Sequence, residues 1–519
     1  MAKAETPASQ DVPAIELIAI DKRFGAVHAN KNINLKVARG SIHGVIGENG
    51  AGKSTLMSIL YGFYSADSGE IRINGKPVNI RSSQDAIKSG IGMVHQHFML
   101  VDNFSVLENI MLGAEGGATL TGGEAKLRVA LKKLSDDYEL EVDPDALIED
   151  LPVGLQQRVE ILKALTRGAD TLILDEPTGV LTPAEADHLF NILRQLKNQG
   201  KNILLITHKL REIMAITDSV SVMRRGEMVA TVKTSETSPE ALAELMVGRR
   251  VLLEVDKGPA KPGEVRLSVS NLTVKDEWGV ARVDNVSFNV RDGEIVGIAG
   301  VSGNGQSELL AALAGIEKAF AGKFIISGET IDPTHEADPA KMRERGVAHV
   351  PEDRHHMGLV LPFEENENAI LGYHRSPLYG EGPFLSPDKV RKDALVKITK
   401  FDIRPDNCRL KTANFSGGNQ QKIVLAREME RDPKLLLVGQ PTRGVDIGAI
   451  EFIHKQLIAM RDAGKAILLV SVELDEIRSL ADRVLVMFAG RIVGEVSPDA
   501  DEGEIGLLMA GINKKEAAK

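Results

Sequence analysis

The sequence has 519 residues, a length that corresponds to about two to four domains. Its net charge of −10 argues against non-specific nucleic-acid binding as the main activity, and no nucleic-acid partner is expected. The single cysteine, Cys408, excludes an internal disulfide framework and a thiolate metal cluster. No apolar run approaches the roughly 18 residues that a membrane-spanning helix needs, so any spanning segments are expected in other subunits.

The first strong pattern along the chain is a glycine loop. Residues 1–13 resemble a polar tail, and Ile15–Ile20 alternates as a strand does. Apolar Ile42–Ile46 then leads into the loop, and helix-forming residues follow it. The loop reads Gly47, Glu48, Asn49, Gly50, Ala51, Gly52, Lys53, Ser54. Its glycines let backbone N–H groups converge on a polyphosphate, Lys53 would reach the β- and γ-phosphates, and Ser54 would ligate Mg²⁺.

Polar residues that follow later strand-like runs complete this chemistry. Asp175 ends an apolar strand and can hold Mg²⁺ through its waters. Glu176 follows it and can orient or deprotonate an attacking water. His208 could contact the γ-phosphate, and Gln96 could sense Mg²⁺ or water. A helical stretch at about 97–165 predicts a subdomain inserted into a parallel, helix-covered sheet.

The second half of the chain repeats the first. The loop is echoed 253 positions later at Gly300–Ser307, and Leu172–Thr178 is echoed 264 positions later at Leu436–Thr442. The order of the motifs is kept, which predicts two copies of one domain. We expect a first domain over 14–250, a linker over 251–263 and a second domain over 264–513.

These motifs, together with Phe415-Ser-Gly-Gly-Asn-Gln-Gln421, resemble those of the ATP-binding subunits of ABC transporters. The tandem form with one degenerate half is similar to bacterial importers of simple sugars and nucleosides. The resemblance implies an α/β fold with two tandem P-loop ATPase domains and ATP held between them, head to tail, as a pseudo-dimer within one chain. It also implies that Phe24 stacks on adenine, that ATP contacts extend to Thr55, and that the signature Ser416, Gly417 and Gly418 closes on ATP with Asp446.

The two halves depart from the family pattern in opposite ways. In the second half, Gln306 replaces the loop lysine, and Gly439, Gln440 and Val472 replace the Mg²⁺ carboxylate, the base and the histidine; Glu352 stands in the place of Gln96. In the first half, the signature position holds Pro152 and Val153, and proline removes a hydroxyl and a backbone N–H. Head-to-tail packing would collect all intact parts in one site and all defects in the other. We therefore expect one hydrolytic site per chain and one structural or weakly nucleotide-binding site, in which backbone amides around Ser302–Ser307 can still hold a nucleotide.

The resemblance also implies partners and a location. Permease subunits would span the membrane, an extracytoplasmic solute-binding protein would act indirectly, and this chain would lie at the cytoplasmic face of the inner membrane as a peripheral subunit. Apolar residues in Phe98–Asp102 and Leu361–Phe363 could contact the permease or simply belong to the core. Tyr61–Tyr64 and Leu151–Leu165 favour a nucleoside importer over a ribose or galactose importer. A soluble, ribosome-associated ATPase is the distant alternative, which the short linker and the degraded second site disfavour.

Overall fold

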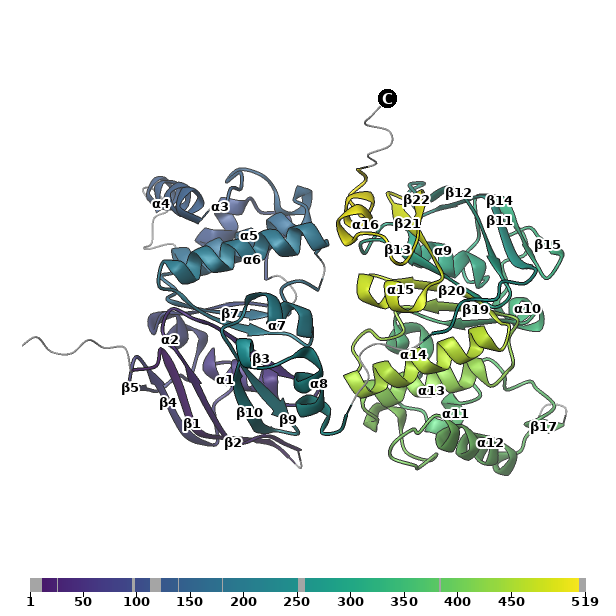
Figure 1. Cartoon of the computed structure of the whole chain (residues 1–519), viewed down its shortest axis with the longest axis horizontal. Helices are drawn as coiled ribbons and strands as arrows, with labels where there is room; N and C mark the ends of the chain where they lie inside the picture. The colour runs from purple at the N-terminus through teal and green to yellow at the C-terminus, as the bar shows by residue number, and fades with distance from the viewer. Residues whose placement is uncertain are drawn as a thin grey trace, which may run out of the picture. The chain divides into compact units, whose positions relative to one another are not determined.

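The computed structural model describes residues 12–25, 27–95, 99–112, 123–138, 140–179, 181–250, 257–381 and 384–512. The chain divides into two compact units, residues 1–251 and 252–519 (Figure 1). Both are α/β, and each combines a six-stranded sheet with a four-stranded antiparallel sheet and helices. Among the described residues, no helix is long and apolar enough to cross a bilayer.

The six-stranded sheet of the first unit has the order β10-β9-β3-β8-β7-β6. Strands β9, β3, β8, β7 and β6 are parallel, so their carboxyl ends meet at one edge. The central strand β3 (Ile42–Gly47) is buried along its whole length. The other strands are β6 (Ile91–Val94), β7 (Thr171–Asp175), β8 (Asn202–Ile206), β9 (Ser219–Arg224) and β10 (Glu227–Lys233).

An antiparallel sheet of order β2-β1-β4-β5 accompanies it, and the sequence patterns did not predict this sheet. It contains β1 (Ile15–Phe24), β2 (Val27–Val37), β4 (Ser68–Ile73) and β5 (Lys76–Val78). Ile15, Leu17 and Ile20 of β1 enter the same core as Leu56 and Met57 of α1 (Lys53–Leu60). The predicted strand at Ile15–Ile20 therefore serves to pack the phosphate loop and its helix.

The predicted helical insert is present between β6 and β7. It contains α3 (Val106–Met111), α4 (Gly123–Tyr138) and α5 (Val153–Thr166), which gather at the opposite end of the unit from the antiparallel sheet (Figure 1). The remaining helices are α2 (Ser83–Lys88), α6 (Pro183–Asn198), α7 (Leu210–Ile216) and α8 (Pro239–Val247). The predicted N-terminal tail, apart from Val12 and Pro13, and the first part of the linker fall outside the described residues.

The second unit repeats this architecture, with a six-stranded sheet of order β16-β19-β20-β13-β21-β22 and an antiparallel sheet of order β12-β11-β14-β15. Successive side chains of β19, such as Leu435 and Leu436, enter different cores on the two faces of the sheet. This alternation follows from the two-residue repeat of a strand. The near-continuous apolar runs therefore belong to strands covered on both faces.

The strands of the second unit are β11 (Val265–Lys275), β12 (Ala281–Arg291), β13 (Glu294–Ala299), β14 (Ala321–Ile326), β15 (Glu329–Ile331), β16 (Val347–Val350), β17 (Gly380–Glu381), β18 (Phe384–Leu385), β19 (Leu435–Gly439), β20 (Ala466–Ser471), β21 (Arg483–Phe488) and β22 (Arg491–Val496). Its helices are α9 (Gln306–Leu313), α10 (Pro339–Glu344), α11 (Glu365–Asn368), α12 (Pro387–Lys400), α13 (Gly417–Met429), α14 (Ile447–Asp462), α15 (Leu474–Leu480) and α16 (Glu502–Met509).

Candidate functional site

The glycine loop of the first unit connects β3 to α1 and is pressed against β2. Gly52 has a φ of 100°, a left-handed backbone that favours glycine. A Cβ atom at Gly52 would overlap the carbonyl oxygen of Ala29 in β2. The buried side chain of Asn30, also in β2, donates from Nδ2 to the Gly52 carbonyl at 3.0 Å. The loop shape thus depends on Asn30, a residue that no local sequence signal identified.

Lys53, the first residue of α1, folds back over its own loop. Its Nζ donates to the carbonyl oxygens of Gly47 at 2.6 Å and Glu48 at 3.0 Å. The side chain is buried, and burial lowers the pKa of Lys53, while the nearby charges of Glu176 and Asp175 oppose that shift. These charge interactions confirm that the loop and the end of β7 lie close together. Phosphate oxygens are acceptors that could replace the two carbonyls.

Asp175 and Glu176 stand at the carboxyl end of β7, which lies between β8 and β6. Burial, followed by repulsion from Glu176, raises the pKa of Asp175 to about 6, although Lys53 opposes the shift. A buried carboxyl whose negative form is disfavoured in this way is stabilised by a cation. Ser54 is exposed at the second position of α1. Its hydroxyl and the carboxylate of Asp175 are oxygen ligands of the type that Mg²⁺ prefers.

Glu176 and His208 form a hydrogen-bonded pair at this strand edge. The Nδ1 atom of His208 lies 2.8 Å from Oε1 of Glu176. Burial alone would raise the pKa of Glu176, but the hydrogen bond and the charge of His208, with Lys53 and Lys209, bring it below its ordinary value. Glu176 has a φ of 48°, and its N–H donates to the Ile206 carbonyl at 2.8 Å. The left-handed backbone at Glu176 directs its carboxylate toward His208. The hydrogen bond and the charge of His208 then favour the ionised form of the carboxylate.

Three further residues were predicted at the ATP site: Gln96, Phe24 and Thr55. Gln96 lies outside the described residues. Phe24 ends β1, is 42% exposed, and meets the ring of Tyr64 edge-on with centroids 5.1 Å apart. An exposed aromatic ring at the end of β1 is available to a nucleobase, but the adenine assignment stays a prediction. Thr55 is the third residue of α1.

The corresponding edge of the second unit keeps the backbone and changes the side chains. Gln440 has a φ of 46°, and its N–H donates to the Val470 carbonyl at 2.8 Å, as Glu176 does to Ile206. Val472 stands where the first unit has His208, and its backbone N–H donates to Oε1 of Gln440 at 3.2 Å. Gln306 is buried at the start of α9, where Lys53 stands in the first unit. The second unit therefore lacks the carboxylate–imidazole pair.

The predicted signature residues of the second unit lie together. Ser416 caps α13, and its hydroxyl accepts from Nδ2 of Asn419 at 2.8 Å. A Cβ atom at Gly418 would lie 2.9 Å from Oδ2 of Asp446, the residue that caps α14. In the first unit Pro152 stands at the start of α5 without a side-chain cap. Of Val153, the structure describes only that it belongs to α5.

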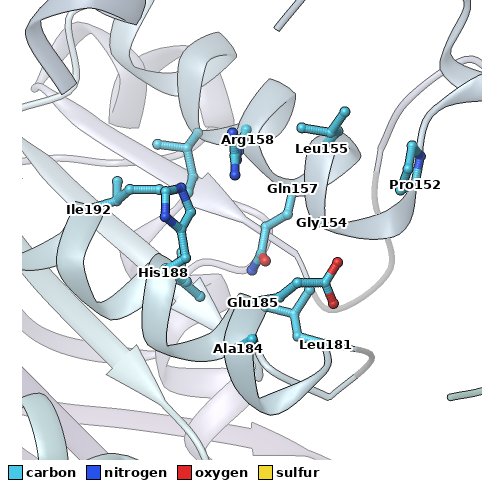
Figure 2. Close-up of a pocket in the computed structure, with 12 residues that line it drawn as sticks. Pro152, Gly154, Leu155, Gln157, Arg158, Leu181, Ala184, Glu185, His188 and Ile192 are labelled. Carbon is cyan, nitrogen blue, oxygen red and sulfur yellow. The ribbon is translucent and has the colours of Figure 1, made fainter. Parts of the chain in front are cut away.

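A pocket of about 330 Å³ lies between α5 and α6 in the first unit (Figure 2). Its lining includes Pro152, Gly154, Leu155, Arg158, Glu185 and His188. In the second unit, Phe452 stands 264 positions after His188 and packs against Phe401, with Nζ of Lys422 4.7 Å from its ring centre. The rest of the lining is aliphatic apart from Gln157, whose Nε2 donates to the carbonyl of Pro177, and comprises Ile161, Leu181, Ala184, Leu189 and Ile192.

Comparison with known families identifies the family of this chain. A family model described as ABC transporter matches residues 30–179 and 283–443, which together exceed half of the chain. This chain belongs to the ABC transporter family. It matches that family twice, and it is an ATP-binding subunit with ATPase activity.

Relatives cover the ABC subunit almost from end to end. The nucleoside import ATP-binding protein NupA of Lactococcus lactis subsp. cremoris and the guanosine import ATP-binding protein NupO of Bacillus subtilis are each 49% identical over 97% of this chain and 99% of the relative. The glucose import ATP-binding protein TsgD13 of Haloferax volcanii is 45% identical over 96% of both chains. The tandem arrangement is therefore shared at full length with importer subunits.

Proposed function

We propose that this ABC subunit powers the import of nucleosides. The observation that carries the proposal is the 49% identity, over nearly the whole of both chains, to two subunits named for nucleoside and guanosine import. The chain would work with membrane-spanning permease subunits, receive cargo indirectly from an extracytoplasmic solute-binding protein, and lie peripherally at the cytoplasmic face of the cell membrane. Met99 and Phe363, which are 60% and 41% exposed, are available for contact with the permease.

Hydrolysis would use one site per chain. The first unit, which we assign to 14–250, supplies Lys53, Ser54, Asp175, Glu176 and His208, and the second unit, assigned to 264–513, supplies Ser416, Gly417, Gly418 and Asp446, with 251–263 as the linker. Support comes from the asymmetry of the two units: the complete phosphate loop and the complete signature occur in different units. Phe24 and Gln96 would complete the ATP contacts.

The side chains of the first unit suit in-line attack of water on the γ-phosphate. Bound Mg²⁺, held by Ser54 and Asp175, would neutralise phosphate charge during transfer. Lys53 would exchange the Gly47 and Glu48 carbonyls for phosphate oxygens. Glu176, ionised and fixed by its hydrogen bond to His208, would accept a hydrogen bond from the water and orient it.

Uptake measurements test the cargo. In cells that lack this chain, we expect uptake of labelled nucleosides to fall to background and to return when the chain is supplied. The Glu176→Gln variant should not restore it, because it should bind ATP and stall. Unchanged nucleoside uptake in the cells that lack the chain would contradict the proposal.

Sugar import is the second candidate, favoured by the 45% identity to a glucose import subunit. The same cells should be assayed with labelled glucose and ribose. Loss of sugar uptake with normal nucleoside uptake would decide for this alternative. Stimulation of the ATPase by ribosomes, rather than by the permease, would decide against transport altogether.

A further inference from the structure

The phosphate loop of the second unit keeps the shape of the first. Gly303 and Gly305 have φ values of 87° and 95°, close to the 80° and 100° of Gly50 and Gly52. Asn304 anchors the loop, because its Oδ1 accepts from the N–H of Ala489 at 2.9 Å. Backbone N–H groups arranged in this way form a phosphate-binding concavity even without a lysine.

The gap left by the missing strand-end carboxylate is filled from another part of the chain. A Cβ atom at Gly439 would lie only 2.5 Å from Cγ of Glu352. Glu352 follows β16, and its side chain thus occupies the space beside the end of β19 that an aspartate would enter. The second unit therefore keeps one carboxylate at this edge, although Gly439 itself provides none.

Glu352 is also joined to the serine of the loop. Ser307 donates from Oγ to Oε2 of Glu352 at 2.6 Å, and Ser307 is the exposed counterpart of Ser54. The second carboxylate oxygen, Oε1, is buried and has no hydrogen-bond partner among the described residues. A serine hydroxyl and a carboxylate are thereby placed side by side at the start of α9, which are the two ligand types that Ser54 and Asp175 supply in the first unit.

The amide of Gln306 is a second polar group without a partner. Gln306 is 4% exposed, and its Nε2 has no hydrogen-bond partner among the described residues. A Cβ atom at Gly300 would overlap this Nε2, so the amide lies folded against the loop. A buried donor of this kind costs free energy unless a ligand oxygen meets it. Gln306 carries no positive charge, so a triphosphate at this loop would face the carboxylate of Glu352 without a compensating lysine.

We propose that Glu352 and Ser307 form a divalent-cation site through which the second unit binds a nucleoside triphosphate. The cation would bridge the carboxylate and the phosphates, so nucleotide would bind at this loop only together with Mg²⁺ or Mn²⁺. Burial raises the pKa of Glu352, with Ser307 and Arg443 opposing the shift, which is the same imbalance that a cation relieves at Asp175. The inference rests on the ATP-binding part of the proposed function and not on the identity of the cargo.

The test counts nucleotides bound to the full chain. Equilibrium dialysis with a non-hydrolysable ATP analogue should give two per chain with Mn²⁺. The Lys53→Ala variant weakens the phosphate loop of the first unit. In this variant the remaining nucleotide should be lost when Mn²⁺ is chelated. Mn²⁺ binding can be followed directly by electron paramagnetic resonance. Glu352→Ala in that background, which removes the ligand oxygens altogether, should weaken the remaining binding at least tenfold.

A rescue separates ligation from folding. Glu352→Ala combined with Gly439→Asp moves the carboxylate to the strand end, as in the first unit, and should restore Mn²⁺-dependent binding. Equal or tighter binding in Glu352→Ala alone would overturn the inference, since the carboxylate would then hinder phosphate binding. A single bound nucleotide per chain that disappears with Lys53→Ala would also overturn this inference. That result would leave the assignment of the first unit's ATP site unchanged. No nucleotide at either loop would overturn both this inference and the proposed ATPase.

Discussion

At the scale of single residues, the first unit separates the tasks of its two adjacent carboxyl groups. Asp175 is half-buried beside a second negative charge, which favours its neutral form until a cation arrives. Glu176 has a hydrogen bond from His208 that favours its ionised form. Two neighbouring acids with pKa values displaced in opposite directions can serve as metal ligand and as proton acceptor, respectively.

Replacement of Glu176 should separate binding from turnover. In Glu176→Gln we expect the ATPase rate to fall by about 10²- to 10⁴-fold, because the water loses its proton acceptor. Affinity for ATP should change little, since Lys53 and the loop remain. Glu244→Gln, an exposed glutamate of α8, is the matched control and should keep full activity. Normal turnover in Glu176→Gln would exclude the assigned role.

The raised pKa of Asp175 predicts a pH-dependent cation affinity. Below pH 6 the carboxyl of Asp175 becomes neutral. The Mn²⁺ affinity of the first unit's site should therefore fall by about tenfold per pH unit. For stability without metal the sign is reversed: the folded protein binds the proton more tightly than the unfolded chain, so stability decreases as pH rises from about 4 to about 6. Asp175→Asn should abolish both dependences. A flat Mn²⁺ affinity between pH 5 and 7 would refute the ligand assignment.

At the scale of elements, a buried acid distinguishes α11, which follows β16 in the second unit, from α3, which follows β6 in the first. α3 begins with Val106 and α11 with Glu365, and both helices have a capping box at the preceding residue. Glu365 is fully buried, and neither carboxyl oxygen has a hydrogen-bond partner among the described residues. Burial raises the pKa of Glu365 to about 8, although Lys397 opposes the shift. This carboxyl is therefore neutral in the folded insert at neutral pH.

Replacement of Glu365 should remove a pH-dependent instability. The folded state holds the proton of Glu365 more tightly than the unfolded chain does. The contribution of Glu365 to the free energy of unfolding is therefore greatest below about pH 4.5 and decreases as pH rises toward 8. Glu365→Val, which copies Val106, should therefore raise the urea midpoint at pH 8 by more than at pH 6. An equal shift at both pH values would show that packing, rather than ionisation, is responsible.

At the scale of the whole molecule, the intact signature and the intact phosphate loop belong to different units. Ser416 caps α13 through its hydroxyl, whereas Pro152 offers α5 no side-chain cap. If one hydrolytic site draws on both units, damage to the second signature should stop hydrolysis at a loop that the first unit supplies. The two signature positions thus have unequal importance.

We expect Ser416→Ala to lower the ATPase rate at least tenfold, and Pro152→Ala to lower it much less. Both variants should be compared at saturating ATP and well below their unfolding temperatures, because Ser416 also caps a helix and a lost cap costs about 1 kcal/mol. A larger effect at Pro152 than at Ser416 would reverse the assignment of the two sites.

Much of this organisation follows from sequence patterns alone. The flanked loop at Gly47–Ser54 and the polar residues after β7 and β8 were predictable, because the ends of parallel strands meet at one edge. The inserted helices were predictable from the helical stretch at about 97–165. The antiparallel sheet was not, since β1 pairs with β4 across more than forty residues of intervening chain. The approach of Glu352 to Ser307 was also missed, because it depends on the empty space at Gly439.

The shared left-handed backbone at Glu176 and Gln440 has an evolutionary consequence. An ancestral domain that duplicated would have passed this bend to both units. The second unit would then have changed its side chains while its main chain kept the same conformation. The loss of catalysis that we propose for the second unit would therefore be a matter of a few codons and not of architecture. Gln440→Glu together with Val472→His would return an acid and an imidazole to the same left-handed bend.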